Sequence, residues 1–325
     1  MPPSFNDIRL TLNTAQLLSV AKDLQLVTFD GDVTLYADGG SLLETDIIIP
    51  RLLAILAAGI GVAIVTAAGY RKASRYYERL SGLLDSVHAA EGFGTLKNPT
   101  LLIMGGESNY LFRYSPTAET LLEYIPRSDW LLPDMHAWTE ANIADVLDVA
   151  EEALQECVTT LSLDAQILRK ERAVGIIPSA RKGARKFTRE QLEETVLVTQ
   201  QVVETSAAGQ KIPFCAFNGG NDVFVDIGDK SWGVLACQKY LGGIDGARTL
   251  HVGDQFLSAG ANDFKVLMHT AVSDLPLGLT HADCDLQARL ACTTAWIASP
   301  AETIQLLDEL ASHAGRPGCL DVGER

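Results

Sequence analysis

The segment LQLVTFDGDVT, residues 24–34, decides the fold class of this chain. Its first six residues are mostly apolar and include two β-branched side chains, which predicts a short buried strand that ends at Asp30. The segments GVAIVT at 61–66 and RTLHVGD at 248–254 show the same pattern of an apolar strand with a polar end. Helical spacing at 48–58, together with a helix expected to begin at Tyr70, places helices between strands. This alternation indicates an α/β fold with a doubly wound parallel sheet.

The polar residues at the strand ends are the candidate site. Ligands of open parallel sheets bind beyond the carboxyl ends of the strands, so Asp30, Thr66 and Asp254 are expected to share one crevice. Asp32 lies two residues after Asp30, where it can act as general acid and base while Asp30 acts as nucleophile. Asp263, in the segment HVGDQFLSAGANDF, adds a further oxygen donor. The carboxylates of Asp30, Asp32, Asp254 and Asp263 are the kind of ligand that suits Mg²⁺.

Two further residues complete a set for phosphoryl transfer. The hydroxyl of Thr66 can bind a phosphate oxygen, and Lys230, in DIGDKSWG, can stabilise the charge of the transition state. Each residue type also has an ordinary structural use: Asp-x-Asp forms turns, Thr suits strands, most lysines are solvated, and Asp263 can cap a helix. The ordered combination of four motifs favours phosphoryl chemistry through an aspartyl-phosphate.

The order and spacing of these motifs resemble the haloacid-dehalogenase superfamily. The fuller strings FDGDVTLYADGG, NGGNDVFVDIGDKSWG and HVGDQFLSAGANDF resemble the IMP-specific 5′-nucleotidase family, and the resemblance covers most of the chain. It implies Mg²⁺-dependent hydrolysis of IMP to inosine and phosphate. It also implies a homotetramer, with a nucleotide such as ATP as a possible effector. The scattered cysteines independently predict reduced thiols and a cytoplasmic location.

The alternation of strands and helices becomes less regular over residues 86–217 and then returns, which predicts a core of residues 1–85 and 218–325 with an inserted α+β cap of residues 86–217. The segment ERAVGIIPSARKG resembles a cap segment of eukaryotic phosphomannomutase, which implies that part of it faces the nucleotide. The cap residues concerned are Arg172, Ser179, Arg181 and Lys182.

Three further residues are substrate-binding candidates. The pattern around Asp38, in LYADGG, indicates a turn. The resemblance implies instead that this loop lies beside the substrate, where the carboxylate can accept hydrogen bonds from ribose hydroxyls. Asn218 and Asp222 lie in a glycine-containing NGGND segment, where the backbone can approach a ligand or simply form a turn.

Composition limits the partners of the chain. With 26 basic and 41 acidic residues, the formal charge of −15 disfavours binding to nucleic acid and to anionic membranes. The six cysteines form no CxxC pair, and none of the six histidines has the spacing of metal ligands. Two other functions remain open: a sugar-phosphate phosphatase or phosphomannomutase-like phosphotransferase, and a catalytically dormant nucleotide sensor or scaffold.

Overall fold

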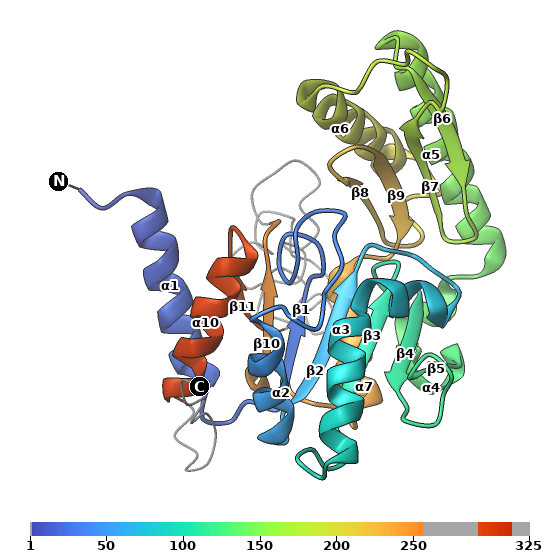
Figure 1. Cartoon of the computed structure of the whole chain (residues 1–325). Helices are drawn as coiled ribbons and strands as arrows, with labels where there is room; N and C mark the ends of the chain where they lie inside the picture. The colour runs from blue at the N-terminus through green and yellow to red at the C-terminus, as the bar shows by residue number, and fades with distance from the viewer. Residues whose placement is uncertain (1, 256–291, 314–325) are drawn as a thin grey trace, which may run out of the picture.

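Strand β1 (Leu26–Phe29) lies between β2 (Gly61–Thr66) and β10 (Thr249–Gly253) in a seven-stranded sheet. This is a computed structural model, and it describes residues 2–255 and 292–313 (Figure 1). Both neighbours run parallel to β1, and the sheet has the order β11-β10-β1-β2-β3-β4-β5. The predicted α/β fold with a parallel sheet at its core is confirmed.

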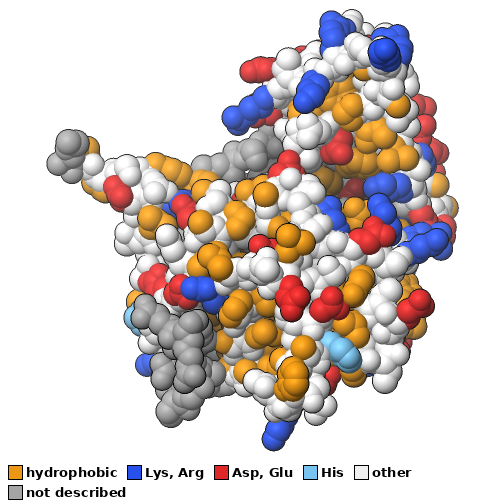
Figure 2. All heavy atoms as spheres, viewed as in Figure 1, with side chains coloured by type: hydrophobic (Ala, Val, Ile, Leu, Met, Phe, Trp, Pro, Cys, Tyr) orange, Lys and Arg blue, Asp and Glu red, His pale blue; other side chains and the backbone are white. Residues whose placement is uncertain are grey.

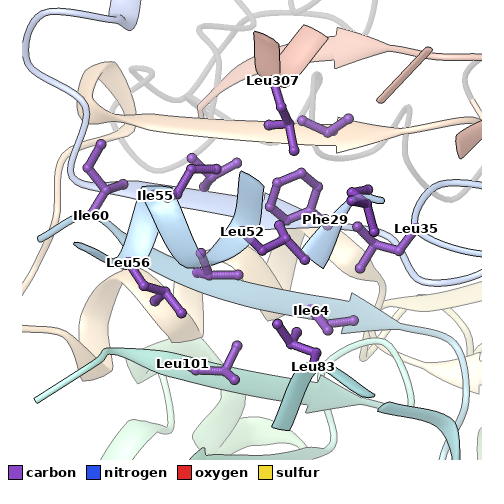
Figure 3. Close-up of a cluster of buried hydrophobic side chains, with 14 of the residues drawn as sticks. Phe29, Leu35, Leu52, Ile55, Leu56, Ile60, Ile64, Leu83, Leu101 and Leu307 are labelled. Atoms are coloured by element: carbon purple, nitrogen blue, oxygen red, sulfur yellow. The ribbon is translucent and has the colours of Figure 1, made fainter. Parts of the chain in front are cut away.

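Alternate strand residues face opposite sides of this sheet. On one side, Phe29 and Ile64 join the core that α1 (Phe5–Val20), α2 (Ile49–Ala57), α3 (Ala73–Gly92) and α10 (Pro300–His313) cover. Phe29 of β1, Leu52 of α2 and Leu307 of α10 point toward one another there (Figure 3). On the other side, Ala63 and Val65 pack in the cluster that includes apolar residues of α7 (Lys230–Tyr240). Helices on both faces are the arrangement of a doubly wound sheet.

The sheet continues beyond β2 through a meander that the expected boundaries had placed in the cap. β3 (Leu101–Gly105) runs parallel to β2, and β4 (Tyr110–Tyr114) and β5 (Leu122–Ile125) follow in antiparallel order. β3 joins the core sheet because its apolar side chains pack on both faces, Ile103 on one and Met104 on the other.

A second lobe contains a four-stranded antiparallel sheet with the order β6-β7-β9-β8. α5 (Glu140–Thr160) and α6 (Arg189–Thr205) cover one of its faces (Figure 1). This sheet includes residues 223–227, which the expected boundary at 218 had assigned to the core. They pair with both β7 and β8, so they form an inner strand of the second-lobe sheet. The strands are β6 (Ala165–Arg169), β7 (Ala173–Pro178), β8 (Phe214–Asn218) and β9 (Val223–Ile227).

Short elements connect these layers. α4 (Arg127–Trp130) and the 3₁₀ helix η1 (Pro133–Ala137) lead from β5 to the second lobe, η2 (Gly246–Arg248) precedes β10, and β11 (Thr293–Trp296) forms the sheet edge. The candidate ligand Asp263 lies outside the described residues. Within the described part of the chain, no helix is both long and apolar enough to cross a membrane.

Candidate active site

The ends of three parallel strands meet at one cavity, as the sequence predicts. Asp30 follows β1, Thr66 ends β2, and Asp254 follows β10; all three line a cavity of about 520 Å³. The strands end level with one another because Phe29 pairs with Val252 on one side and Ile64 on the other. The carboxyl edge of the sheet therefore forms the floor of the cavity.

A buried ion pair lies in this floor. Nζ of Lys230 is 2.9 Å from Oδ2 of Asp30, and the two side chains are only 1% and 8% exposed. The other carboxylate oxygen of Asp30 accepts a hydrogen bond from the backbone N–H of Gly31 at 2.7 Å. Lys230 is the first residue of α7, where Asp229 caps the helix by accepting from the N–H of Ser231. Two opposite charges are thus fixed side by side with little water, where their electrostatic effect is strong.

Arg79, on α3, holds the second carboxylate of the Asp-x-Asp motif. Its guanidinium lies 2.6 Å from Oδ1 of Asp32 and 5.2 Å from the ring centroid of Tyr36. The same carboxylate oxygen accepts from the N–H of Gly39 at 2.9 Å. Burial raises the pKa of the Tyr36 hydroxyl well above its ordinary value, and the nearby Asp32 adds to the shift. Asp32 is thereby oriented at the cavity wall by two donors.

The loop after Thr66 is held by backbone contacts from the β3–β4 turn. Thr66 Oγ1 accepts from the N–H of Ala68 at 3.1 Å, and the carbonyl of Thr66 accepts from the N–H of Glu107 at 3.0 Å. The carbonyl of Ala68 accepts from Gly106 N–H and from the hydroxyl of Tyr76. These hydrogen bonds fix the position of the threonine hydroxyl in the cavity that Asp30 also lines.

Asp38, Asn218 and Asp222 also line the cavity, as expected of substrate-binding candidates. A Cβ on Gly220 would lie 2.7 Å from Oδ2 of Asp38, so the NGGND turn closely approaches the loop after Asp32. Gly220 has φ +87°, a conformation that favours glycine. Burial raises the pKa of Asp222 to about 6, with a further rise from Asp38 and an opposing effect from Lys170.

The four cap residues expected to face the nucleotide do not line this cavity. Arg172 is buried and forms an ion pair with Glu140 of α5. Arg181 is exposed and pairs with Asp164 at 2.9 Å. Ser179 accepts from the backbone N–H of Arg181, and Lys182 is exposed. Acidic partners within the second lobe engage both guanidinium groups, and the contact of these four residues with a nucleotide stays a prediction.

The sequence patterns did not identify the other residues that line the cavity, because those residues lie on elements that are distant along the chain. Arg79 is 47 residues from Asp32, and the second lobe contributes aromatic and charged side chains that local patterns do not connect to the motifs. Where the second lobe meets the core, apolar, basic and acidic side chains lie together on the surface (Figure 2). The additional lining side chains include Tyr70, Arg79, Lys170, Arg189, Glu193, Phe217, Phe224 and Gln255.

The oxygen donors in the floor fit a hard divalent cation. Asp30 and Asp254 follow adjacent parallel strands and line the same cavity. Among the described residues, no group of three His, Cys, Asp or Glu side chains could hold a metal ion alone. Mg²⁺ commonly takes only one or two protein carboxylates and completes its shell with water and substrate phosphate oxygens. The donor set is therefore compatible with Mg²⁺.

Comparison with known proteins identifies relatives of this chain. A family model described as IMP-specific 5′-nucleotidase matches residues 1–274. The IMP-specific 5′-nucleotidase 1 of Aspergillus fumigatus is 56% identical over 310 residues, which are 95% of this chain and 63% of that protein. The chain thus spans slightly less than two thirds of that relative's length.

Solved structures agree with this similarity. An IMP-bound mutant of the Plasmodium falciparum IMP-nucleotidase is 32% identical, with a TM-score of 0.77, over 96% of this chain and 73% of that chain. The ATP-bound form of the same protein is 33% identical, with a TM-score of 0.76, over 98% of this chain and 67% of that chain. On the match of its sequence over residues 1–274, and with the motif residues gathered at one cavity, the chain belongs to the IMP-specific 5′-nucleotidase family.

Proposed function

We propose that this chain is a Mg²⁺-dependent 5′-nucleotidase that hydrolyses IMP to inosine and phosphate. The observation that carries the proposal is the buried Asp30–Lys230 pair at the floor of a cavity shared with Thr66 and Asp254. Family membership supplies the substrate: the relatives are named for IMP, and one solved neighbour is described as IMP-bound.

The reaction follows from the placement of two carboxylates. A carboxylate oxygen of Asp30 attacks the phosphorus of IMP, and the bond from phosphorus to the ribose 5′-oxygen breaks as Asp32 gives that oxygen a proton. Asp32 then takes a proton from water, which attacks the phosphorus of the aspartyl-phosphate. The bond between phosphorus and Asp30 breaks, which releases inorganic phosphate and restores the carboxylate. Lys230 stabilises the negative charge on the transferring group.

Asp30 and Asp254 would hold Mg²⁺, with Asp32 and Asp263 as the other predicted ligands. Bound Mg²⁺ supplies positive charge that offsets the repulsion between the carboxylates and the phosphate. Removal of the cation with EDTA should abolish phosphate release, and Mg²⁺ should restore it. Hydrolysis at an unchanged rate in EDTA would contradict the metal requirement.

We further propose that the second lobe, residues 140–227, closes the nucleotide end of the cavity as a cap. Asp38, Asn218 and Asp222 line the cavity where this lobe approaches the core. The ATP-bound neighbour supports a nucleotide effector such as ATP for this chain as well. The predicted homotetramer is tested by light scattering of the purified chain with and without ATP.

The decisive assay is phosphate release from a panel of substrates in the presence of Mg²⁺. The panel contains IMP, GMP, AMP and mannose 6-phosphate at equal concentrations. The proposal predicts the highest kcat/KM with IMP and formation of inosine. Preferred hydrolysis of the sugar phosphate, or its conversion to an isomer, would contradict it.

A further inference from the structure

The end of β10, which leads into the candidate metal ligand Asp254, is held by the edge strand β11. Gly253, the last residue of β10, lies opposite Trp296, the last residue of β11. The carbonyl of Gly253 accepts from the backbone N–H of Ile297 at 2.9 Å. The next carbonyl, that of Asp254, lies beyond the strand and accepts from the indole N–H of Trp296 at 2.9 Å. A side chain therefore extends the hydrogen-bond ladder by one residue, to a residue that lines the cavity.

Helix α1 holds the backbone of Trp296 from the outer edge of the sheet, where it lies beside β11 and α10 (Figure 1). The N–H of Trp296 donates to Oδ1 of Asn13 at 3.0 Å, and Nδ2 of Asn13 donates to the carbonyl of Trp296 at 2.6 Å. One amide side chain thus pairs with both backbone groups, as a neighbouring strand would. Nη1 of Arg9 donates to the same carbonyl at 2.6 Å. The position of Trp296 is therefore tied to α1.

Further contacts from α1 orient the indole ring. The ring of Phe5 meets it edge-on, with the ring centroids 5.4 Å apart and the planes at 65°. The guanidinium carbon of Arg9 lies 5.6 Å from the centroid of the indole ring. Arg9 is itself fixed, because its side chain is only 5% exposed and lies 2.8 Å from the carboxylate of Glu302 on α10. Aromatic and cationic contacts of this kind are directional, so they set the ring plane and aim the indole N–H.

We infer that Trp296 is a positioning residue for the metal site, because its indole N–H restrains the backbone of Asp254 and thereby the place of the carboxylate. The inference rests on the proposed Mg²⁺-dependent function and adds a residue that does not itself line the cavity. Loss of an outer contact that orients a metal ligand typically weakens metal binding about 10- to 100-fold. The contact of Trp296 is to the backbone of Asp254 and not to its carboxylate, so the lower end of this range is expected.

The test follows Mg²⁺ binding through thermal stability, without substrate. Stabilisation by a ligand depends on the ratio of its concentration to its Kd, so weaker binding moves the whole curve of Tm against Mg²⁺ to higher concentration. Trp296→Phe keeps an aromatic ring but removes the N–H, and its curve should move to about tenfold higher Mg²⁺. Its Tm in EDTA measures the structural role of the indole separately. Asn13→Ala, which removes the amide that holds Trp296, should move the curve in the same direction.

Trp130→Phe is the matched control. Nε1 of Trp130 donates to the carbonyl of Ile125, the last residue of β5, at 3.2 Å, and the guanidinium carbon of Arg127 lies 5.1 Å from its ring centroid. The substitution therefore removes the same kind of hydrogen bond at the opposite edge of the sheet. Because distant sites act independently, its Mg²⁺ curve should stay within about twofold of the wild-type curve.

The inference is overturned if Trp296→Phe moves the Mg²⁺ curve no further than Trp130→Phe does. If Trp296→Phe does not fold, an unmoved curve for Asn13→Ala overturns it. It is also overturned if Mg²⁺ does not raise the Tm of the wild-type chain, because Asp254 then binds no metal. The proposed function is measured separately by phosphate release: a wild-type chain whose Tm rises with Mg²⁺ but that does not hydrolyse IMP refutes the nucleotidase activity, and the comparison of Mg²⁺ curves still decides the role of Trp296.

Discussion

Replacing Lys230 with Met should destabilise the chain far more than removing an ordinary surface lysine. The substitution leaves the Asp30 carboxylate without its cation at a site where the two side chains are 1% and 8% exposed. At 2.9 Å and an effective dielectric constant of about 20, the attraction between the two charges is roughly 6 kcal/mol. Much of that attraction offsets desolvation, and breaking a buried pair from one side typically costs about 3 to 5 kcal/mol.

This free-energy cost can be converted into an expected decrease in melting temperature. An unfolding entropy of about 2.1 cal/mol/K per residue gives about 0.7 kcal/mol/K for 325 residues, so each kcal/mol corresponds to roughly 1.5 °C. Lys230→Met should therefore lower the Tm by about 4 to 7 °C when measured by circular dichroism in EDTA. Lys239→Met is a comparison on the same helix, because its ammonium group is exposed. It should lower the Tm by less than about 2 °C.

A double-mutant cycle tests the reasoning. In Asp30→Asn combined with Lys230→Met, neither charge remains. The double variant should therefore lose less Tm than the two single variants lose in total. The expected coupling is about 2 to 4 kcal/mol, or roughly 3 to 6 °C. Additive losses, within about 1 °C, would refute the claim that the two charges stabilise each other in the floor of the cavity.

Three other substitutions test which side chains act at the cavity and which do not. Arg79→Gln should lower kcat for IMP at least about tenfold, with a smaller change in KM, because the guanidinium 2.6 Å away orients Asp32; an unchanged kcat would contradict this role. Arg181→Ala should leave the KM for IMP within about twofold, since its guanidinium pairs with Asp164 and does not line the cavity. Asp222→Asn should raise the Tm by about 2 °C at pH 7.5 and leave it unchanged near pH 4. The folded carboxyl group, with a pKa of about 6, keeps its proton to a higher pH than in the unfolded chain, so its ionisation lowers stability as pH rises through 4 to 6. Equal pH dependence in variant and wild type would contradict the last prediction.

The floor of the cavity could be predicted from sequence because its geometry follows from local patterns and one general rule. Each apolar strand ends in a polar residue, and parallel strands present their carboxyl ends at one edge. That rule is sufficient to bring Asp30, Thr66 and Asp254 together without knowledge of any side-chain contact. Lys230 was a candidate for its charge, but its burial beside Asp30 could not be predicted, because nothing in DIGDKSWG itself indicates a buried lysine.

The wall of the cavity could not be predicted in this way. The pairing of Arg79 with Asp32 and the contact of Phe224 with Gly175 depend on how distant elements pack, which no periodicity encodes. The lobe boundaries were displaced for a similar reason. The GGES sequence predicts a turn between two strands but does not indicate which sheet those strands join. In the structure β3 pairs with β2, beginning with Leu101 opposite Val62, so the strands belong to the core sheet.

The most direct test of the central claim is turnover of IMP by Asp30→Asn in the presence of Mg²⁺. The variant is first shown to be folded by circular dichroism, since the substitution also leaves Lys230 without its carboxylate partner at 2.9 Å. With Asp30 as the nucleophile, kcat should fall at least about a thousandfold, and added Mg²⁺ should not restore it. A folded Asp30→Asn variant that releases phosphate from IMP at the wild-type rate would contradict the account.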